Sequence, residues 1–265
     1  MPKLLFFDID GTLYDDRIGR PPDSVPPALR RARERGCRLF LNTGRTLCNL
    51  DRLLDDLPFD GRVLGCGTRV IYLGETIRCL EHDHETSLAI RRVFLDSGLP
   101  TVFECDTALY FEPWSVDLPI LRDFRDYARS RRIARQIRAE DPEFRAVKMF
   151  SFAEDPAALQ ALMDRLAAGG TPYQAIYRGW NGYEIVPAGC SKASGIDLIC
   201  ERTGAGLADC YVFGDSENDL SMLTHVPNSI AMGNAEEAVK ARCSYVTDRA
   251  ENDGIAKALA HFRLI

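Results

Sequence analysis

The order of apolar and amphipathic segments limits the possible folds of this chain more than any other feature. An apolar run at 4–7 (LLFF) precedes a helix predicted over 24–36, with Ser24 as its N-cap and Gly36 as its stop. A second apolar run, in CRLFLNTGR, is followed by leucines at helical spacing over 46–57, where we expect another helix. Repeated strands and helices with continuously apolar strands predict a parallel sheet covered on both faces.

The C-terminal part of the chain repeats this order. Helices are predicted at SKASGIDLICERTG, SENDLSMLTHV, AEEAVKAR and GIAKALAHF, and strands at DCYVFGD, NSIAMG and SYVT. We therefore expect an α/β fold whose Rossmann-like, doubly wound core is formed by residues 1–83 and 183–265 together.

The middle of the chain has a different pattern. Longer apolar runs, TVFECDTALYFEP and AVKMFSF, flank helices predicted at about 85–97, 115–130 and 156–168. Residues 84–182 are therefore expected to form an inserted α+β domain.

Composition and charge narrow the class of protein. With 46% hydrophobic and 27% charged residues, the chain has the balance of an ordinary globular protein, so disorder is not expected. Its 33 basic and 39 acidic residues give a net charge of -6, which repels nucleic-acid phosphates and anionic membranes. We expect neither nucleic acid nor a membrane as partner.

The cysteines and the N-terminus suggest a compartment. Nine widely spaced cysteines without a C-x-x-C pair argue against a disulfide framework and a structural zinc site. The start, MPKLLFFDID, is charged too early for a secretory signal, and no apolar run approaches the ~20 residues that span a bilayer. These features predict a reduced cytoplasmic protein, of unknown oligomeric state.

Two aspartates follow the first apolar run at once. Asp8 and Asp10 are one residue apart, a spacing that places both side chains on one side of a strand, and Gly11 allows a sharp turn next to them. Paired carboxylates repel unless a cation lies between them, and Mg²⁺ prefers such oxygen ligands. The alternative is a solvated strand end.

A second acidic cluster lies in FGDSENDLSML, residues 213–223. Asp215 follows an apolar strand, and Asn218 and Asp219 follow in the next turn. Together with the first pair, they supply further oxygen ligands for a metal ion. The alternative is an acidic helix N-terminus, which the helix dipole also favours.

Two other sites suit phosphate oxygens. Thr43 offers a hydroxyl and Gly44 a backbone N–H in LNTGR, at the expected start of a helix. Lys192 lies at the start of a helix in GCSKASG. Taken separately, the first is equally consistent with a simple strand–helix turn, whereas a lone lysine such as the second is usually a surface residue.

In this order, the four motifs resemble those of haloacid dehalogenase-like phosphohydrolases. Their spacing is similar to the Cof-type subgroup (subclass IIB), in which a cap domain is inserted between the second and third motifs. The tail AMGNAEEAVKARCSYVTDRAENDGIAKAL also resembles that subgroup. The likeness covers residues 1–83 and 183–265, whereas over 84–182 it is only architectural.

The resemblance implies a role for each residue. Asp8 would be the nucleophile that forms an aspartyl phosphate, and Asp10 the general acid and then base. Mg²⁺ would be held by Asp8, Asp215 and the Asp10 backbone carbonyl, with support from Asp219. The phosphoryl group would be bound by Thr43, Gly44 and Lys192, with Asn218 orienting Lys192 or a phosphate oxygen.

The expected function is that of a Mg²⁺-dependent phosphatase for small phosphorylated metabolites, with sugar phosphates as the first candidates and with the cap selecting the leaving group. A phosphomutase of the same fold and a non-enzymatic phospho-aspartate switch or binding module remain as alternatives. In the expected cap, one helical face of LRDFRDYARSRR carries Arg122, Arg125, Arg129 and Arg132. This face is either an anion-attracting rim or simply solvated.

Overall fold

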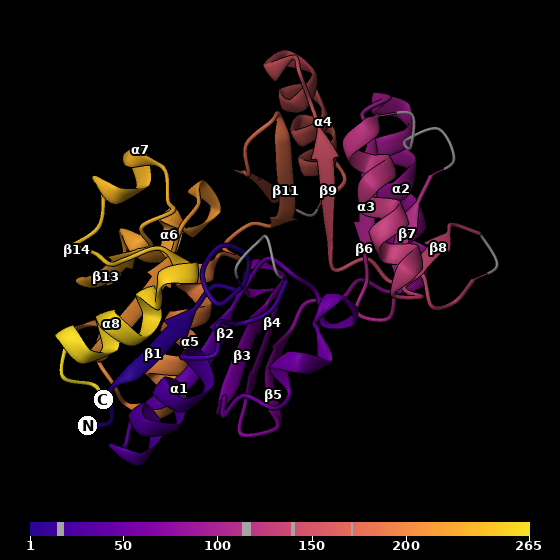
Figure 1. The fold of residues 1–265 in the computed structure, drawn as a ribbon. Coiled ribbons are helices and arrows are strands. Elements are labelled where there is room, and N and C mark those ends of the chain that lie inside the picture. Colours follow the sequence, from indigo (N-terminus) through magenta and orange to yellow (C-terminus); the bar gives the residue numbers. More distant parts are fainter. Residues whose placement is uncertain (15–18, 113–117, 139–140, 171) are drawn as a thin grey trace. The chain divides into compact units, whose positions relative to one another are not determined.

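The computed structural model of the chain describes residues 1–14, 19–112, 118–138, 141–170 and 172–265. These residues form two compact units, each built on its own sheet (Figure 1). The larger unit combines Met1–Gly44, Asp51–Arg78 and Ser191–Ile265. The smaller unit consists of Arg45–Leu50 and Cys79–Cys190.

The strands of the larger unit are β1 (Leu4–Phe7), β2 (Arg38–Asn42), β3 (Gly61–Leu64), β4 (Arg69–Tyr72), β5 (Glu75–Cys79), β12 (Cys210–Gly214), β13 (Asn228–Ala231) and β14 (Tyr245–Val246). Its α-helices are α1 (Val25–Glu34), α5 (Lys192–Thr203), α6 (Leu220–Leu223), α7 (Glu237–Lys240) and α8 (Gly254–His261). Across the sheet, the strand order is β14-β13-β12-β1-β2-β3-β4-β5.

Six neighbouring strands of this sheet, from β14 to β3, run parallel, and β4 returns antiparallel to β3. Helices α5 and α6 cover the face that presents Leu4 and Phe6. On the other face, α1 and α8 pack side by side, and Phe262, just after α8, meets Tyr211 of β12 (Figure 1). The strands read as apolar runs because both faces are covered.

The smaller unit has a mostly antiparallel sheet of order β10-β11-β9-β6-β7-β8. Its strands are β6 (Thr101–Glu104), β7 (Leu109–Phe111), β8 (Ala134–Gln136), β9 (Lys148–Phe152), β10 (Tyr173–Tyr177) and β11 (Gly182–Pro187). Its α-helices are α2 (His84–Ser97), α3 (Pro119–Ser130) and α4 (Pro156–Ala168).

Each face of this second sheet has its own apolar core. Side chains such as Phe103 and Met149 pack with residues of α2 and α4, including Phe94 and Leu162. The alternate positions, among them Val102, pack with residues of α3. Strand alternation therefore assigns α2 and α4 to one face and α3 to the other.

The predicted fold class is confirmed, because the structure pairs a doubly wound, largely parallel α/β sheet with an inserted α+β unit. From the sequence, the domain boundaries were predicted between residues 83 and 84 and between residues 182 and 183. The compact units of the structure change after Arg78 and after Cys190. The later change arises because β11 pairs with β9 and β10 of the smaller sheet.

One predicted helix is wrong. Residues 46–57 form two single-turn 3₁₀ helices, Leu47–Asn49 and Arg52–Leu54, separated by Leu50 and Asp51 in extended conformation. The chain leaves the smaller unit and re-enters the larger one at this point, so one continuous helix does not form.

Other predicted helices are shorter than expected or begin partly outside the described residues. A 3₁₀ turn at Glu217–Asp219 replaces the first part of the helix that leads into α6, and α7 has a single turn. The expected helix at 115–130 begins in residues that lie outside the described part, and α3 is described from Pro119.

Candidate active site

The candidate site lies at the carboxyl ends of the central strands of the larger sheet. Register pairs Phe7 at the end of β1 with Phe213 of β12 on one side and Leu41 of β2 on the other. Asp8 therefore emerges at the same edge as Asp215, which follows β12 directly. In open α/β sheets, this edge is where ligands bind.

Lys192 connects two of the carboxylates. It is the first residue of α5, whose N-cap Ser191 forms a capping box with Ser194. Its ammonium donates to Asp8 Oδ1 at 2.6 Å and to Asp219 Oδ1 at 2.5 Å, and all three side chains are buried. The helix start thus places a buried cation between two acidic loops.

Asp215 completes a group of three carboxylates. One oxygen each from Asp8, Asp215 and Asp219 lies within 4.8 Å of the others. The second oxygen of Asp219 accepts from the backbone N–H groups of Asp215 and Ser216, at 3.0 and 3.1 Å. Asp219 therefore fixes the loop that carries Asp215 while it also holds Lys192.

The charges in this group perturb one another. Burial raises the pKa of Asp8 to about 7, assisted by the charges of Asp219 and Asp10 and opposed by Lys192. Burial also raises the pKa of Asp215 to about 9, and the charges of Asp219 and Asp8 act in the same direction. Burial alone would lower the pKa of Lys192. The two carboxylates that it contacts outweigh this effect, so its pKa lies above the usual value.

This donor set fits a hard divalent cation. The oxygens converge from the loops after β1 and β12. Burial first, and then the neighbouring carboxylate charges, raise the pKa values of Asp8 and Asp215, so a cation bound between these carboxylates would favour their ionised forms. A cation of the Mg²⁺ type takes carboxylate oxygens as ligands.

The close approach of the two acidic loops depends on Gly11. Its φ of +76° is a conformation that side chains disfavour, and a Cβ there would lie 2.3 Å from Asp215 Oδ2. Next to it, the Thr12 hydroxyl donates to Asp215 Oδ1 at 2.9 Å. The Asp-x-Asp-Gly-Thr segment thus packs on the second acidic cluster as well as carrying Asp8.

The remaining predicted residues lie at the same edge with different contacts. Asp10 lies outside β1, because the strand ends at Phe7, and it is half-buried. Thr43 and Gly44 follow β2 and are buried, but Gly44 lies in a bend and not at the start of a helix. Asn218 accepts a hydrogen bond from the Ser216 hydroxyl at 2.6 Å.

Sequence reasoning missed three supporting residues. Besides Thr12, Asn234 donates to the Gly11 carbonyl at 2.8 Å and accepts from the Ala250 N–H. Asn42 donates to the Lys192 backbone carbonyl at 3.0 Å. The only available signals were that Thr12 belongs to the first motif, that Asn42 precedes the Thr43 motif, and that Asn234 lies in the C-terminal segment that resembles the family.

Comparison with known proteins places this arrangement in a family. The sequence model of the haloacid dehalogenase-like hydrolases matches residues 5–259, nearly the whole chain. The chain belongs to the haloacid dehalogenase-like hydrolase family. The resemblance identified from the four motifs is confirmed.

Relatives of this family member extend over its full length. The HMP-PP phosphatase of Enterobacter sp. (strain 638) is 29% identical over 280 residues, covering 99% of this chain and 96% of that protein. The HMP-PP phosphatase of Escherichia coli (strain K12) is 27% identical over 279 residues, with the same coverage. Among solved structures, the HAD subclass IIB sugar phosphatase BT4131 has a TM-score of 0.81 at 27% identity, covering 99% of this chain and all of that one.

These comparisons establish the class of activity. The prediction of an enzyme, a phosphoric monoester hydrolase, is confirmed by the family and by relatives named phosphatases. Such an enzyme acts on small phosphorylated substrates. Among the helices of the described residues, none combines the length and the apolar character needed to cross a membrane.

Proposed function

We propose that this hydrolase is a Mg²⁺-dependent phosphatase that acts on small phosphorylated metabolites through an aspartyl phosphate on Asp8. The observation that carries the proposal is the contact of one buried ammonium, Lys192, with Asp8 and Asp219 beside the Asp215 carboxylate. A nucleophilic carboxylate needs such compensation, because it must approach a phosphate ester that is itself negatively charged.

Asp8, Asp215 and the backbone carbonyl of Asp10 would hold the metal ion. When bound, Mg²⁺ neutralises charge on the phosphoryl oxygens and keeps Asp8 ionised. Asp219 supports this arrangement through Lys192 and through the backbone of the Asp215 loop.

The side chains of the larger unit then carry two half-reactions. In the first, Asp8 attacks phosphorus, the bond from phosphorus to the leaving oxygen breaks, and Asp10 gives its proton to the alkoxide. In the second, Asp10 takes a proton from water, which attacks the aspartyl phosphate and releases inorganic phosphate. Lys192, Thr43 and the Gly44 N–H bind the phosphoryl oxygens, and Asn218 orients Lys192 or a phosphate oxygen.

Sugar phosphates are the first substrates to test. BT4131, which is 27% identical, is a sugar phosphatase, whereas the two relatives described above are HMP-PP phosphatases. The smaller unit, as the expected cap, would select the leaving group. A panel of phosphorylated sugars and phosphorylated heterocycles, ranked by kcat/KM, separates these classes.

The decisive experiment measures release of inorganic phosphate from p-nitrophenyl phosphate with and without Mg²⁺. Asp8→Asn removes the nucleophile with little change of shape, so we expect kcat to fall at least about a thousandfold. Asp209→Asn is the matched control, because Asp209 lies just before β12, pairs with Lys3 and is remote from the carboxyl end of that strand. Full Mg²⁺-dependent activity in Asp8→Asn would show that the nucleophile has been assigned wrongly.

A further inference from the structure

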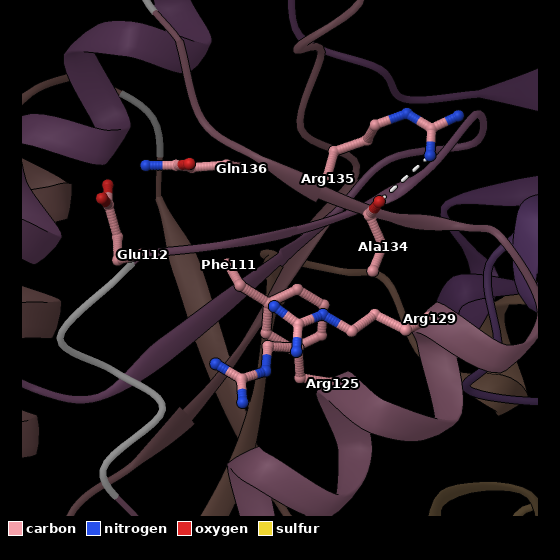
Figure 2. Close-up of a pocket in the computed structure, with 7 residues that line it drawn as sticks. All are labelled: Phe111, Glu112, Arg125, Arg129, Ala134, Arg135 and Gln136. Atoms are coloured by element: carbon pink, nitrogen blue, oxygen red, sulfur yellow. Dashed lines mark hydrogen bonds between the residues drawn. The ribbon is translucent and has the colours of Figure 1, made fainter.

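The smaller unit contains a pocket of about 360 Å³ beside α3, at the edge of its sheet where β7 and β8 pair. Figure 2 shows the side chains that line it: Phe111, Glu112, Arg125, Arg129, Ala134, Arg135 and Gln136. Two of the four arginines that the sequence placed on one helical face, Arg125 and Arg129, are among them. The volume suits a small molecule.

Among the described residues that line this pocket, three arginines stand against one acid. The acid in the lining, Glu112, is buried and engaged by both Nε and a terminal nitrogen of the Arg91 guanidinium. Its charge is therefore compensated from outside the pocket lining.

Arg125 and Arg129 share one exposed partner. Asp126 Oδ1 lies 3.6 Å from Arg125 Nε and 3.4 Å from an Arg129 terminal nitrogen, and its side chain is 58% exposed. The two arginines are four residues apart on α3, a spacing at which like charges destabilise a helix. One solvated carboxylate offsets that repulsion only weakly.

Two further details concern the arginine donors of the described lining. Arg125 Nε is buried and has no hydrogen-bond acceptor among the described residues. The Arg135 guanidinium donates to the backbone carbonyls of Arg132 and Ala134, so these contacts position its charge without neutralising it. Buried donors of charged groups are normally hydrogen-bonded, and a planar guanidinium matches phosphate and carboxylate geometry.

We infer that this pocket is a binding site for a small organic anion with two negative charges, either a phosphate monoester or a dicarboxylate. The arginines bind the anionic groups, and Phe111 and Ala134 provide apolar surface for the carbon skeleton. The site lies wholly within the smaller unit, so the inference is independent of the proposed chemistry at Asp8.

Titration calorimetry tests this site on the full chain in metal-free buffer of low ionic strength. Glycerol 3-phosphate and succinate are the two probes, and they distinguish phosphate from carboxylate recognition. We expect saturable binding of at least one, weakened about tenfold or more in Arg125→Gln and in Arg129→Gln, because a hydrogen bond to a charged group is lost. Added salt should weaken the binding as well.

Three variants control for fold and location. Arg92→Gln removes an exposed arginine of α2 in the same unit and should leave the affinity unchanged. Thr43→Val alters the candidate phosphate site of the larger unit and should leave the affinity for succinate unchanged. Arg125→Lys keeps the charge without the planar donor pair and should retain part of the binding, which separates loss of a contact from loss of fold.

The inference is overturned if neither anion binds saturably, or if Arg125→Gln and Arg92→Gln bind equally well. It is also overturned if binding is lost in Thr43→Val and kept in Arg125→Gln, because the anion then occupies the larger unit. A signal that persists in Arg125→Lys and falls in Arg125→Gln supports it.

Discussion

At the scale of single residues, the main feature of the site is the unfavourable burial of several negative charges. Three carboxylates gather around one ammonium in buried surroundings, and the cost appears as raised pKa values at Asp8 and Asp215. A carboxyl group that binds its proton more tightly when folded makes folding less favourable at high pH. The residues that build the site therefore reduce the stability of the metal-free protein.

This effect gives a pH-dependent prediction for Asp215. Its folded-state pKa of about 9 exceeds its ordinary value of 3.8, so the metal-free protein should lose stability as pH rises across that window. The pKa of Asp8 is about 7, so the loss of folding stability between about pH 7 and pH 9 arises from Asp215. We expect Asp215→Asn to flatten the fall in that upper range.

Thermal unfolding in EDTA and in Mg²⁺ measures both parts of this prediction. Mg²⁺ should raise the melting temperature of the wild type by mass action and should raise that of Asp215→Asn much less. Asp209→Asn, at the other end of β12, should behave like the wild type. A pH profile of Asp215→Asn that matches the wild type would contradict the assignment.

The contact of Gly11 with Asp215 gives a second prediction at this scale. Gly11→Ala and Gly74→Ala both impose a side chain on a positive φ, of +76° and +82°, which costs about 1–2 kcal/mol. Only at Gly11 does the new Cβ meet another group, the Asp215 carboxylate, while nothing lies within 4 Å at Gly74. The extra overpacking should cost about 1–3 kcal/mol more.

Denaturant unfolding measures the free energy of unfolding of both variants. The difference between them gives the cost of the clash with Asp215, because the backbone cost is common to both. Mg²⁺ binding should weaken in Gly11→Ala and remain unchanged in Gly74→Ala. Equal stability and equal Mg²⁺ affinity in the two variants would show that the loops separate without penalty.

At the scale of elements, a chain of buried charges crosses the smaller sheet. Lys148 of β9 lies 3.0 Å from Glu104 Oε1 on β6 and 3.1 Å from Glu184 Oε2 on β11, and Arg178 pairs with Glu184 at 2.9 Å. Burial raises the pKa of Glu104, although Lys148 acts against this. The three central strands are thus joined by ion pairs as well as by backbone hydrogen bonds.

Lys148→Met should destabilise the protein by about 3–5 kcal/mol, because two buried carboxylates then lose a shared cation. The loss should be smaller at acidic pH, where the carboxylates can bind protons. Lys257→Met is the control, since its pair with Asp248 is exposed and worth less than about 1 kcal/mol. Equal losses in chemical denaturation of the two variants would contradict this account.

Helices and strands were predicted most accurately where a buried element leads directly into a motif of the site. β1, β12 and α5 were predicted because a continuous apolar run, or a clear helix start, leads into each motif. The helix over 46–57 was wrong, because leucine spacing does not reveal that the chain passes between units at Leu50.

The supporting contacts of the site were harder to predict. Thr12 bonds to a residue 203 positions away, and Asn234 to one 223 positions away. A local pattern holds no information about such pairs. The motifs predicted which residues form the site, whereas the residues that hydrogen-bond to them could be identified only in the folded structure.

At the scale of the whole molecule, the larger unit depends on segments that are distant in sequence. β1 pairs with β2 on one side and with β12 on the other. Removing residues 191–265 should unfold the larger unit, since it deletes β12, β13, β14 and α5 together with Lys192, Asp215 and Asp219.

The smaller unit should survive this truncation, because its sheet and the buried residues of its two apolar cores lie within 79–190, and Arg45–Leu50 is also retained. Hydrogen exchange on the 1–190 fragment should show protection in β6 and β9 and none in β1. Protection of β1 in that fragment would mean that β2 alone is a sufficient partner.

The central place of β1 also affects how the protein is made. The ribosome synthesises β12 about 200 residues after β1, a delay of about 10–40 seconds at typical elongation rates. During that time an apolar strand lacks one of its two neighbours and is exposed to chaperones and to other nascent chains. The inserted unit, Cys79–Cys190, accounts for about half of this delay, so the domain that completes the enzyme also prolongs the exposure of its central strand.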